Sequence, residues 1–224
     1  MAIIELKNVQ KVYGKGAAEV TALNNVNFKA NLGEVVLIMG PSGAGKSTFL
    51  TIAGSLQKPT AGEVIVNGQN IADISAKDSD RLRLTQLGFV LQAYNLVPFL
   101  KVKEQFELVN KVKKTGNINE ETLQKLLKQL GISSLLDKYP AELSGGQQQR
   151  AAIARALYAN PQILLADEPT ASLDSKNVSE VGQLFQNLAK EYHKAILLVT
   201  HDPRLKQYAD HIYEMMDGEI EQKV

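Results

Sequence analysis

The sequence predicts an α/β fold with a mixed, largely parallel sheet core, an N-terminal antiparallel β part and an inserted helical subdomain. Three observations predict it: a glycine-rich loop between a strand and a helix, a strand–helix–strand alternation over 163–200, and a mainly helical pattern over 79–157. Parallel strands joined by helices form sheets that bind ligands at the carboxyl ends of the strands. We expect a single domain with a core over 1–92 and 151–224 and the helical subdomain over roughly 93–150.

Composition narrows the class of protein. The chain has 224 residues, of which 44% are hydrophobic and 22% charged, as in ordinary globular domains. A net charge of +1 gives no indication of a nucleic-acid partner. The lack of cysteine excludes disulfides and thiolate zinc sites. Because no apolar run approaches the ~18–20 residues that span a bilayer, and no signal-peptide pattern begins the chain, we expect a cytoplasmic protein.

Short strands are expected in the first third of the chain. Two runs, Val20–Leu23 and Val26–Lys29, are separated by two asparagines. Two others, Glu63–Val66 and Gln69–Ile71, flank Asn67-Gly68, a dipeptide that favours a two-residue hairpin turn. These runs predict the antiparallel part of the fold.

The glycine-rich loop lies between the apolar run Val35–Met39 and a helix-like run, Ser47–Gln57. Glycine, four spacers, glycine, lysine and serine in this context form a phosphate-binding loop. Its backbone N–H groups turn toward phosphate oxygens, and the helix dipole favours the same anion. Lys46 is expected to contact the β- and γ-phosphates, and the Ser47 hydroxyl to bind Mg²⁺. The expected contacts are Gly40, Pro41, Ser42, Gly43, Ala44, Gly45, Lys46, Ser47 and Thr48.

The middle of the chain is expected to be mainly helical. Leucines recur at helical spacing at positions 123, 126, 127 and 130, with polar residues between them. Farther on, Ala151–Leu157 is an apolar helical run that follows a serine and two glycines, a typical helix start.

Strands return in the last third. Ile163–Ala166 and Ala195–Thr200 have the pattern of buried strands, with a helix at about Lys176–Tyr192 between them; this order predicts parallel pairing. A final hairpin is expected from His211–Met215 and Glu219–Gln222, which flank an Asp-Gly turn.

Two acidic residues follow the strand Ile163–Ala166. A carboxylate at the end of a rigid strand suits magnesium, so Asp167 is expected to hold Mg²⁺ directly or through water. Glu168 is expected to act as general base toward a water that attacks the γ-phosphate. Alone, such a pair is equally explained as polar residues ending a strand, and the phosphate loop favours the functional interpretation.

The segment Leu143–Arg150, with the sequence LSGGQQQR, identifies a family. Locally it is a serine cap and a glycine turn at a helix start, which is also a cradle for an anion. It closely resembles the signature sequence of ATP-binding cassette (ABC) ATPases, and the phosphate loop and acid pair stand around it in that family's order. The resemblance spans essentially the whole chain and implies a P-loop nucleoside triphosphatase fold with ATP and Mg²⁺ as ligands.

The resemblance implies roles for residues outside these motifs. Tyr13 falls where the family stacks an aromatic ring on adenine, with Val20 as a companion contact. Gln92 matches the glutamine that contacts Mg²⁺, and His201 matches the histidine that contacts the γ-phosphate. The segment Ser172–Asp174 matches the loop that crosses to the other subunit.

In this family two cassettes pack head to tail, so the resemblance implies a homodimer that closes on ATP. Each nucleotide is then held by the phosphate loop of one subunit and the signature of the other. Hydrolysis, expected to depend on Lys46, Glu168 and His201, removes the shared ligand and weakens the closed state. The expected signature contacts are Ser144, Gly145, Gly146 and Gln147.

The resemblance also implies a separate membrane permease as partner, with the cassette peripheral on the inner face of the cell membrane. Ala93–Leu100 is apolar and aromatic, and two interpretations stay open: core of the helical subdomain, or part of a groove for a permease coupling helix. Residues 101–130 hold seven lysines and four acids, which form either a solvated face or a surface near anionic lipid.

Short segments outside the main motifs indicate the branch of the family. The loop around Ala17–Val20 and the alanine in Leu165–Thr170 resemble the lipoprotein-release, macrolide-export and antimicrobial-peptide-export branch. Asn95–Val102 and Asp202–Asp210 look most like bacterial haem-efflux ATPases, whose permeases are of a four-helix type. No residue of this chain is expected to touch the cargo, so its identity rests on analogy alone.

Three other functions compete with transport. A cassette that acts on DNA or ribosomes is disfavoured because the sequence shows no coiled-coil insertion, zinc module or second cassette. An ATP-dependent regulator of a membrane or cell-wall complex without transport stays open, because the same motifs fit it. A non-hydrolysing adaptor is disfavoured by the presence of Lys46, Asp167, Glu168 and His201.

Overall fold

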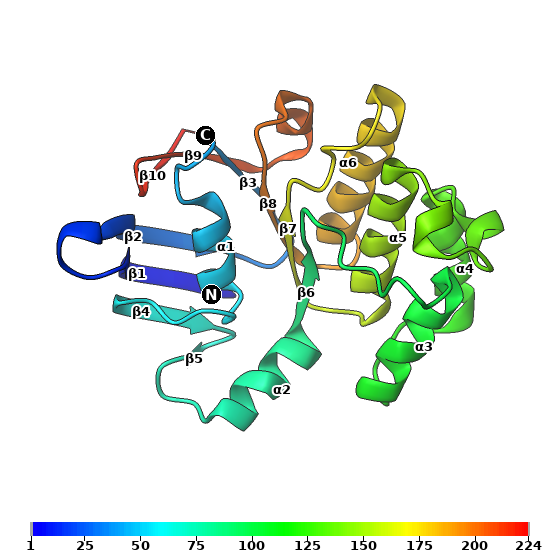
Figure 1. Ribbon diagram of the computed structural model, residues 1–224, viewed down its shortest axis with the longest axis horizontal. Coiled ribbons are helices and arrows are strands. Elements are labelled where there is room, and N and C mark those ends of the chain that lie inside the picture. Colours follow the sequence, from blue (N-terminus) through cyan, green and yellow to red (C-terminus); the bar gives the residue numbers. More distant parts are fainter. Residues whose placement is uncertain (1, 224) are drawn as a thin grey trace.

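The computed structural model describes residues 2–223, and its strands form two sheets (Figure 1). An antiparallel sheet has the strand order β2-β1-β4-β5, and a six-stranded sheet has the order β10-β9-β3-β8-β7-β6. In the second sheet β9, β3, β8, β7 and β6 are parallel, while β10 pairs antiparallel with β9. The strands are β1 Ile4–Tyr13, β2 Val20–Ala30, β3 Val35–Met39, β4 Ala61–Val66, β5 Gln69–Asn70, β6 Leu87–Val90, β7 Ile163–Asp167, β8 Ala195–Val199, β9 His211–Met216 and β10 Glu219–Gln222. The predicted α/β fold is confirmed.

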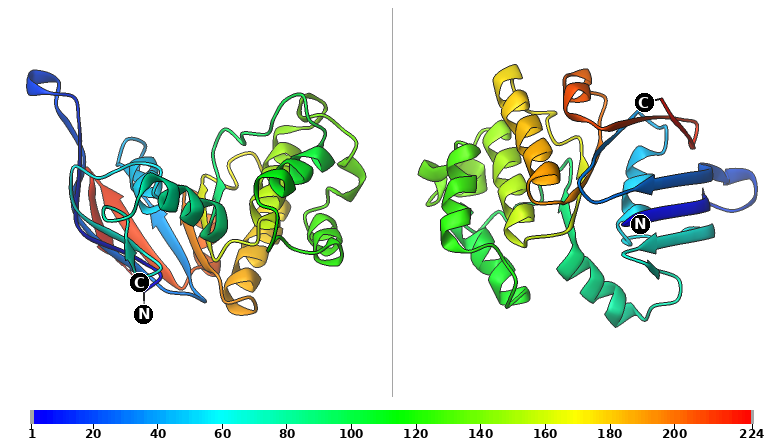
Figure 2. Two further views of the ribbon diagram at one scale, coloured as in Figure 1. Left: turned by 90° about the horizontal axis from the view of Figure 1, so that it is seen from below. Right: turned by 180° about the vertical axis from the view of Figure 1, so that it is seen from behind.

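The helices gather mainly at one end of the molecule. Figure 2 shows the antiparallel sheet and the helices α3 to α5 at opposite ends, with the parallel strands between them. The α-helices are α1 Lys46–Ala53, α2 Ala76–Gln86, α3 Val102–Val112, α4 Glu120–Gln129, α5 Gly145–Tyr158 and α6 Ser175–Lys190. Short 3₁₀ turns are η1 Gly16–Ala18, η2 Ser133–Leu135, η3 Pro140–Glu142 and η4 Pro203–Tyr208. Within residues 2–223, no helix combines the length and apolarity needed to cross a membrane.

The central strands separate two hydrophobic cores. Val36 and Ile38 of β3 face a core shared with the antiparallel sheet and α1, whereas Val35 and Leu37 face a core shared with α3 to α6. All four side chains are fully buried. Because successive residues of a strand point to opposite faces, coverage of both faces explains why this strand is continuously apolar.

The second strand differs from the expectation. Val20–Leu23 and Val26–Lys29 are not separate strands but parts of the continuous β2. Asn25 adopts a left-handed conformation with φ of 50°, and the pairing register with β1 shifts between Val9 and Lys11. The asparagines therefore form a bulge inside one strand rather than a break between two.

Two further expectations about elements are wrong. β6 is a strand inside the region expected to be helical, because parallel pairing with β7 overrides the local pattern. The first helix ends at Ala53 rather than Gln57, since Gly54 ends it and Ser55 turns left-handed with φ of 57°. A short run of mixed apolar residues does not by itself distinguish a buried strand from a helix.

Both predicted hairpins are present. β4 and β5 are joined by Asn67-Gly68 and β9 and β10 by Asp217-Gly218, and all four turn residues have positive φ. That combination is the type I′ turn, whose twist matches paired strands. The predicted strands β7 and β8 and the helices α4, α5 and α6 also lie where the sequence placed them, within a few residues.

The parallel register brings the candidate site together. Val199 at the end of β8 pairs with Ile38 of β3 on one side and with Asp167 of β7 on the other. The phosphate loop leaves β3, the acid pair ends β7 and His201 follows β8. All three therefore emerge at one edge of the sheet, where ligands of such sheets bind.

Candidate functional site

A cleft of about 400 Å³ opens at this edge of the sheet, within the size range of small-molecule sites. It joins the phosphate loop, the acid pair, the glutamine after β6 and the histidine after β8. Its lining residues are Ala22, Ser42, Gly43, Gly45, Lys46, Ser47, Thr48, Gln92, Asp167, Glu168, Ala171 and His201. All except the two alanines are among the site residues predicted from the sequence.

The loop conformation depends on its glycines. Gly45 has φ of 99°, and a Cβ placed there would lie 2.3 Å from the carbonyl oxygen of Ala22. At Gly43, with φ of 86°, a Cβ would meet open space. Gly45 thus allows a close approach of two backbone segments, and Gly43 allows a left-handed turn beside the cleft. Both glycines have the positive φ on which anion-binding backbone loops depend.

Lys46 folds back over the loop. Its Nζ donates hydrogen bonds of 2.8 Å to the carbonyl oxygens of Gly40 and Pro41, and the side chain is nearly buried. The carbonyl groups of Gly40 and Pro41 therefore bind the lysine, and neither residue lines the cleft. Ala44 is also buried, and its N–H donates to Pro41. An ammonium held by neutral carbonyls keeps its charge available for an anion in the loop.

Asp167 and Ser47 make a site suited to a hard cation. Burial raises the pKa of the Asp167 carboxyl, and the charge of Glu168 adds to this effect, whereas a hydrogen bond from Ser47 and the charge of Lys46 oppose it. The carboxylate is thus incompletely compensated by the protein itself. With the Gln92 amide in the same cleft, the donors are all oxygen ligands of the kind that Mg²⁺ prefers.

Glu168 is held at both carboxylate oxygens. The Thr200 hydroxyl donates to Oε2 at 2.8 Å, and His201 Nδ1 lies 2.8 Å from Oε1. The backbone of Glu168 is left-handed, with φ of 48°, a conformation that costs energy in a residue with a side chain and is often found at functional sites. The residue is 9% exposed, whereas the His201 side chain is largely open to solvent.

Thr200 is the residue of the site that the sequence reasoning missed. It is fully buried, and its hydroxyl also accepts a hydrogen bond of 3.0 Å from the N–H of Asp202. Burial raises the pKa of Asp202, but hydrogen bonds from Arg204 and from the Thr170 hydroxyl together bring it below its usual value. The signal available in the sequence was the uninterrupted run Thr-His-Asp at the end of a buried strand.

Tyr13 and Val20 lie outside the cleft. They face each other across β1 and β2 beside the η1 turn, and both are exposed. The Tyr13 hydroxyl donates to Gln57 Oε1 at 2.7 Å, and Lys11 Nζ lies 5.2 Å from the centre of its ring. The structure thus does not bring these two residues into contact with the phosphate loop.

The signature and Asp174 also lie apart from the cleft of the same chain. Ser144 caps α5: its hydroxyl accepts from the N–H of Gln147 at 3.3 Å, and the Gln147 side chain accepts from the Ser144 N–H at 2.9 Å. Gly145 and Gly146 form the first turn. Asp174 caps α6 by accepting from the N–H of residue 177, which lowers its pKa. Ser144 and Gly145 are exposed.

Comparison with known proteins decides the family. The family model described as ABC transporter matches residues 23–171, which is more than half of the chain and includes the phosphate loop, signature and acid pair. The chain belongs to the ABC transporter family. As a cassette of this ATP-binding family it is an ATPase.

The cassette resembles curated relatives over nearly its whole length. It is 42% identical over 221 residues to a Staphylococcus haemolyticus protein named as a hemin import ATP-binding protein, HrtA, covering 97% of this chain and 99% of the relative. It is 43% identical over 226 residues to the ABC transporter ATP-binding protein MJ0796 of Methanocaldococcus jannaschii, covering 99% and 96%.

Solved cassettes share the fold. A dimeric structure of MJ0796 matches with a TM-score of 0.90 at 43% identity, over 97% of this chain and 96% of that chain. Another, described as a post-hydrolysis state bound to ADP and Pi, has a TM-score of 0.91 at 41% identity, over 98% and 97%. A structure of cbiO1 from Clostridium perfringens, described as part of the ABC transporter complex cbiONQ, has a TM-score of 0.81 at 32% identity, over 98% and 87%.

The apolar segment Ala93–Leu100 of the cassette is a surface element. None of its residues is buried; Phe99 is 75% exposed, and Leu96 packs from outside against the helical core. The interpretation as core of the helical subdomain is therefore wrong, because the segment crosses the surface between β6 and α3 instead of packing beneath them.

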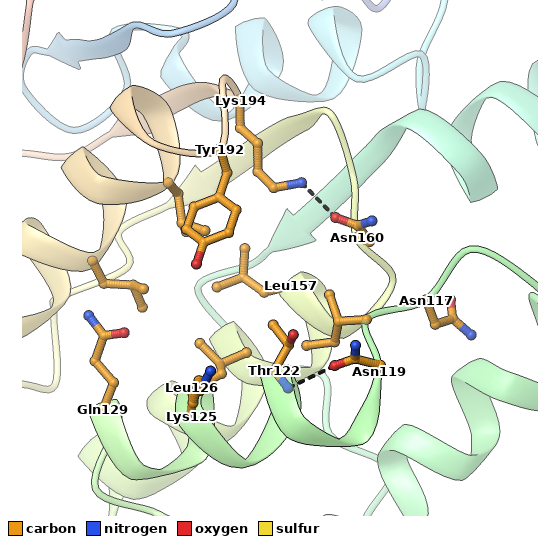
Figure 3. Close-up of a pocket in the computed structure, with 13 residues that line it drawn as sticks. Asn117, Asn119, Thr122, Lys125, Leu126, Gln129, Leu157, Asn160, Tyr192 and Lys194 are labelled. Atoms are coloured by element: carbon orange, nitrogen blue, oxygen red, sulfur yellow. Dashed lines mark hydrogen bonds between the residues drawn. The ribbon is translucent and has the colours of Figure 1, made fainter.

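A second cavity of the cassette, about 450 Å³ in volume, lies among α4, α5 and α6, away from the phosphate loop (Figure 3). Leucines form much of its wall. Its polar groups serve the fold: Lys194 Nζ donates to Asn160 Oδ1 at 2.8 Å, and Asn119 caps α4 by accepting from the N–H of Thr122. None of the site residues predicted from the sequence lines this cavity.

Proposed function

We propose that the cassette is the ATP-hydrolysing subunit of a membrane ABC transporter that drives export of its cargo through a separate permease chain. The observation that carries this proposal is the single cleft that joins Lys46, Asp167, Glu168 and His201. The relatives named as hemin import ATP-binding proteins support haem as the cargo, with a direction opposite to the one proposed here. The relative cbiO1, described as part of a transporter complex, supports a permease partner.

ATP hydrolysis requires a polarised water and compensation of phosphate charge. Glu168 is proposed as the general base, because both of its oxygens are held by neighbours that fix the carboxylate. His201, exposed beside it, is proposed to contact the γ-phosphate, and Lys46 to stabilise the charge that develops there. The remaining phosphate contacts are proposed to come from the loop residues 40–48.

Mg²⁺ fits the oxygen ligands at the carboxyl end of β7. Asp167, Ser47 and Gln92 are proposed to hold it, and the raised pKa of Asp167 supports this assignment because a cation would compensate the buried carboxylate. When bound, Mg²⁺ supplies charge neutralisation at the phosphates. Adenine is proposed to stack on Tyr13 with Val20 beside it, and the exposure of both side chains supports this. Lys11 lies over the ring, so stacking would use the face opposite to it.

A homodimer is proposed to complete each nucleotide site. Ser144, Gly145, Gly146 and Gln147 begin α5 away from the phosphate loop of their own chain, and Asp174 begins α6 beside them. An exposed helix start with two glycines is suited to phosphate. Head-to-tail pairing would place it over the partner's loop. The MJ0796 structures, described as dimeric, support a homodimer.

The permease is proposed to be of the four-helix type and to contact the apolar surface around Phe99, which places the cassette at the inner face of the membrane. Leu108, Val112 and Leu84 are also exposed, and they line a groove between α2, β6 and α3 with Phe89. Exposed apolar side chains gathered in a groove are typical of a docking surface.

Transport is tested with vesicles that contain the permease and the cassette. We expect hemin-dependent stimulation of ATP hydrolysis and ATP-dependent movement of hemin toward the proposed export side, both lost with Glu168→Gln. Hydrolysis without movement of any cargo would instead support the regulator of a membrane or cell-wall complex. Movement in the opposite direction would contradict export while leaving the ATPase assignment intact.

A further inference from the structure

The segment that follows Gln92 is held in an unfavourable backbone conformation. Tyr94 and Asn95 have φ of 58° and 51°, the left-handed region that few residues with a side chain adopt. Asparagine tolerates this region better than tyrosine does. Two such residues in succession persist only where surrounding contacts hold them, so these contacts show what the segment is held against.

Arg155, in the last turn of α5, supplies one set of contacts. Its Nη1 donates to the carbonyl oxygen of Asn95 at 2.5 Å, and its Nη2 donates to that of Tyr94 at 3.2 Å. The guanidinium is half-buried, and burial lowers its pKa. A buried guanidinium needs acceptors for its N–H groups, and here the acceptors are the two carbonyls of the left-handed residues.

Tyr94 ties the same segment to the opposite end of α5. Its hydroxyl hydrogen-bonds with the hydroxyl of Ser172, in the turn between Glu168 and α6. A Cβ on Gly145 would lie 3.5 Å from the Tyr94 hydroxyl, and one on Gly146 would lie 3.0 Å from the carbonyl oxygen of Ser172. The first turn of α5, the tyrosine and this turn therefore form one packed unit.

We infer that Arg155 and Tyr94 are positioning residues that fix Gln92 in the cleft relative to α5. The inference rests on the proposed role of Gln92 in holding Mg²⁺. Arg155 holds the backbone carbonyls two and three residues beyond Gln92, and the Tyr94 hydroxyl ties the same stretch to Ser172. The signature lies at the start of the same helix, α5. Gln92 at one nucleotide site and the signature, which is proposed to contact the other site, therefore move together.

The positioning is tested first without nucleotide. The chain has no cysteine, so Ala93→Cys gives a single attachment site for a spin label within the segment. We expect Arg155→Met to increase the mobility of this label. Arg83→Met is the matched control, because Arg83 Nη1 donates from α2 to the Ser55 carbonyl at 2.7 Å and should leave the label unchanged. Equal mobility in all three proteins would overturn the inference.

The consequence for Mg²⁺ is tested by binding of a fluorescent ATP analogue to Glu168→Gln, with Mg²⁺ and with EDTA. Arg155→Met should reduce the strengthening of binding by Mg²⁺ about tenfold, because groups that orient a metal ligand typically contribute that much to metal affinity. Binding in EDTA should change less than about twofold, as expected when only the metal ligand is disturbed. Tyr94→Phe should show the same selectivity and serves if Arg155→Met does not fold.

Equal losses with and without Mg²⁺ would indicate a merely structural role and overturn the inference, as would no loss at all. Arg155→Lys should lie between wild type and Arg155→Met, because it keeps a positive charge and donors but lacks the rigid planar fork that orients both N–H groups. If the Glu168→Gln parent shows no strengthening by Mg²⁺, the proposed function fails instead, and the label at position 93 still decides whether Arg155 positions the segment.

Discussion

At the scale of single residues, the cleft concentrates charge that the protein itself does not compensate. Burial raises the pKa of Asp167, so the ionised carboxylate is less favourable in the folded than in the unfolded chain. Its contribution to folding stability is therefore fully present below the ordinary aspartate value and is lost as the pH rises through the raised value. A ligand site is maintained here at a cost in stability.

Asp167→Asn is expected to raise the Tm of the nucleotide-free protein near neutral pH and to abolish ATP hydrolysis that depends on Mg²⁺. The gain in Tm should vanish as the pH falls below the ordinary aspartate pKa, where the wild-type carboxyl is protonated in the folded and the unfolded chain; 1 kcal/mol corresponds to roughly 2–4 °C in a chain of this size. Asp174→Asn is the control, because hydrogen bonds from residue 177 lower the pKa of Asp174 and its stability effect has the opposite sign. Thermal melts over this pH range check both, and a Tm gain independent of pH would contradict the account.

Thr200 offers a second test of a single residue. Thr200→Val keeps the shape and removes the hydroxyl that donates to Glu168. Loss of a hydrogen bond to a charged group costs about 1.5–3 kcal/mol, so we expect kcat to fall roughly 10–100-fold, with little change in KM for ATP. Thr200→Ser should retain most of the activity. Steady-state kinetics decide, and a fall in nucleotide affinity with unchanged kcat would remove Thr200 from its assigned role.

At the scale of elements, the start of α5 combines a structural and a functional task. Ser144→Ala removes the cap and should lower stability by about 1 kcal/mol, along with ATP-dependent dimerisation. Ser144→Asp restores the cap, because aspartate accepts from the same N–H, but its negative charge repels phosphate. We expect Ser144→Asp to regain stability without regaining dimerisation. Denaturant unfolding and light scattering separate the two effects, and recovery of the dimer would contradict a phosphate contact.

Elements with a strong local signal were predictable, and those set by tertiary contacts were not. The hairpins at Asn67-Gly68 and Asp217-Gly218 follow from turn chemistry. The strand β6 is fixed by pairing with β7, a contact distant in sequence, and the bulge at Asn25 is fixed by register with β1. Local pattern contains neither kind of information.

The site residues also fall into a group that the sequence predicted and a group that it did not. The phosphate loop and the acid pair were predicted because each motif is contiguous and a parallel sheet brings strand ends to one edge. His201 was predicted from the family resemblance, and it lies in the same cleft. Thr200, Tyr94 and Arg155 were missed because their partners lie far away in the sequence or are backbone carbonyls. The contacts of Tyr94 and Arg155 leave no motif in a single sequence, whereas Thr200 stands in the run Thr-His-Asp at the end of a buried strand.

At the scale of the whole molecule, one chain presents two halves of a nucleotide site that do not meet. The cleft lies at the carboxyl edge of the parallel strands, and the signature begins α5 apart from it. Two copies related by a twofold axis would supply both halves twice. The central claim is therefore that ATP is held between two copies of this chain.

Light scattering after size exclusion of Glu168→Gln, with and without ATP and Mg²⁺, tests this claim most directly. We predict monomer without nucleotide and dimer with ATP and Mg²⁺, since blocked hydrolysis preserves the shared ligand. Ser144→Asp in the same background should remain monomeric while still binding ATP. A Glu168→Gln protein that binds ATP and stays monomeric, both alone and with its permease in detergent, would contradict the shared site.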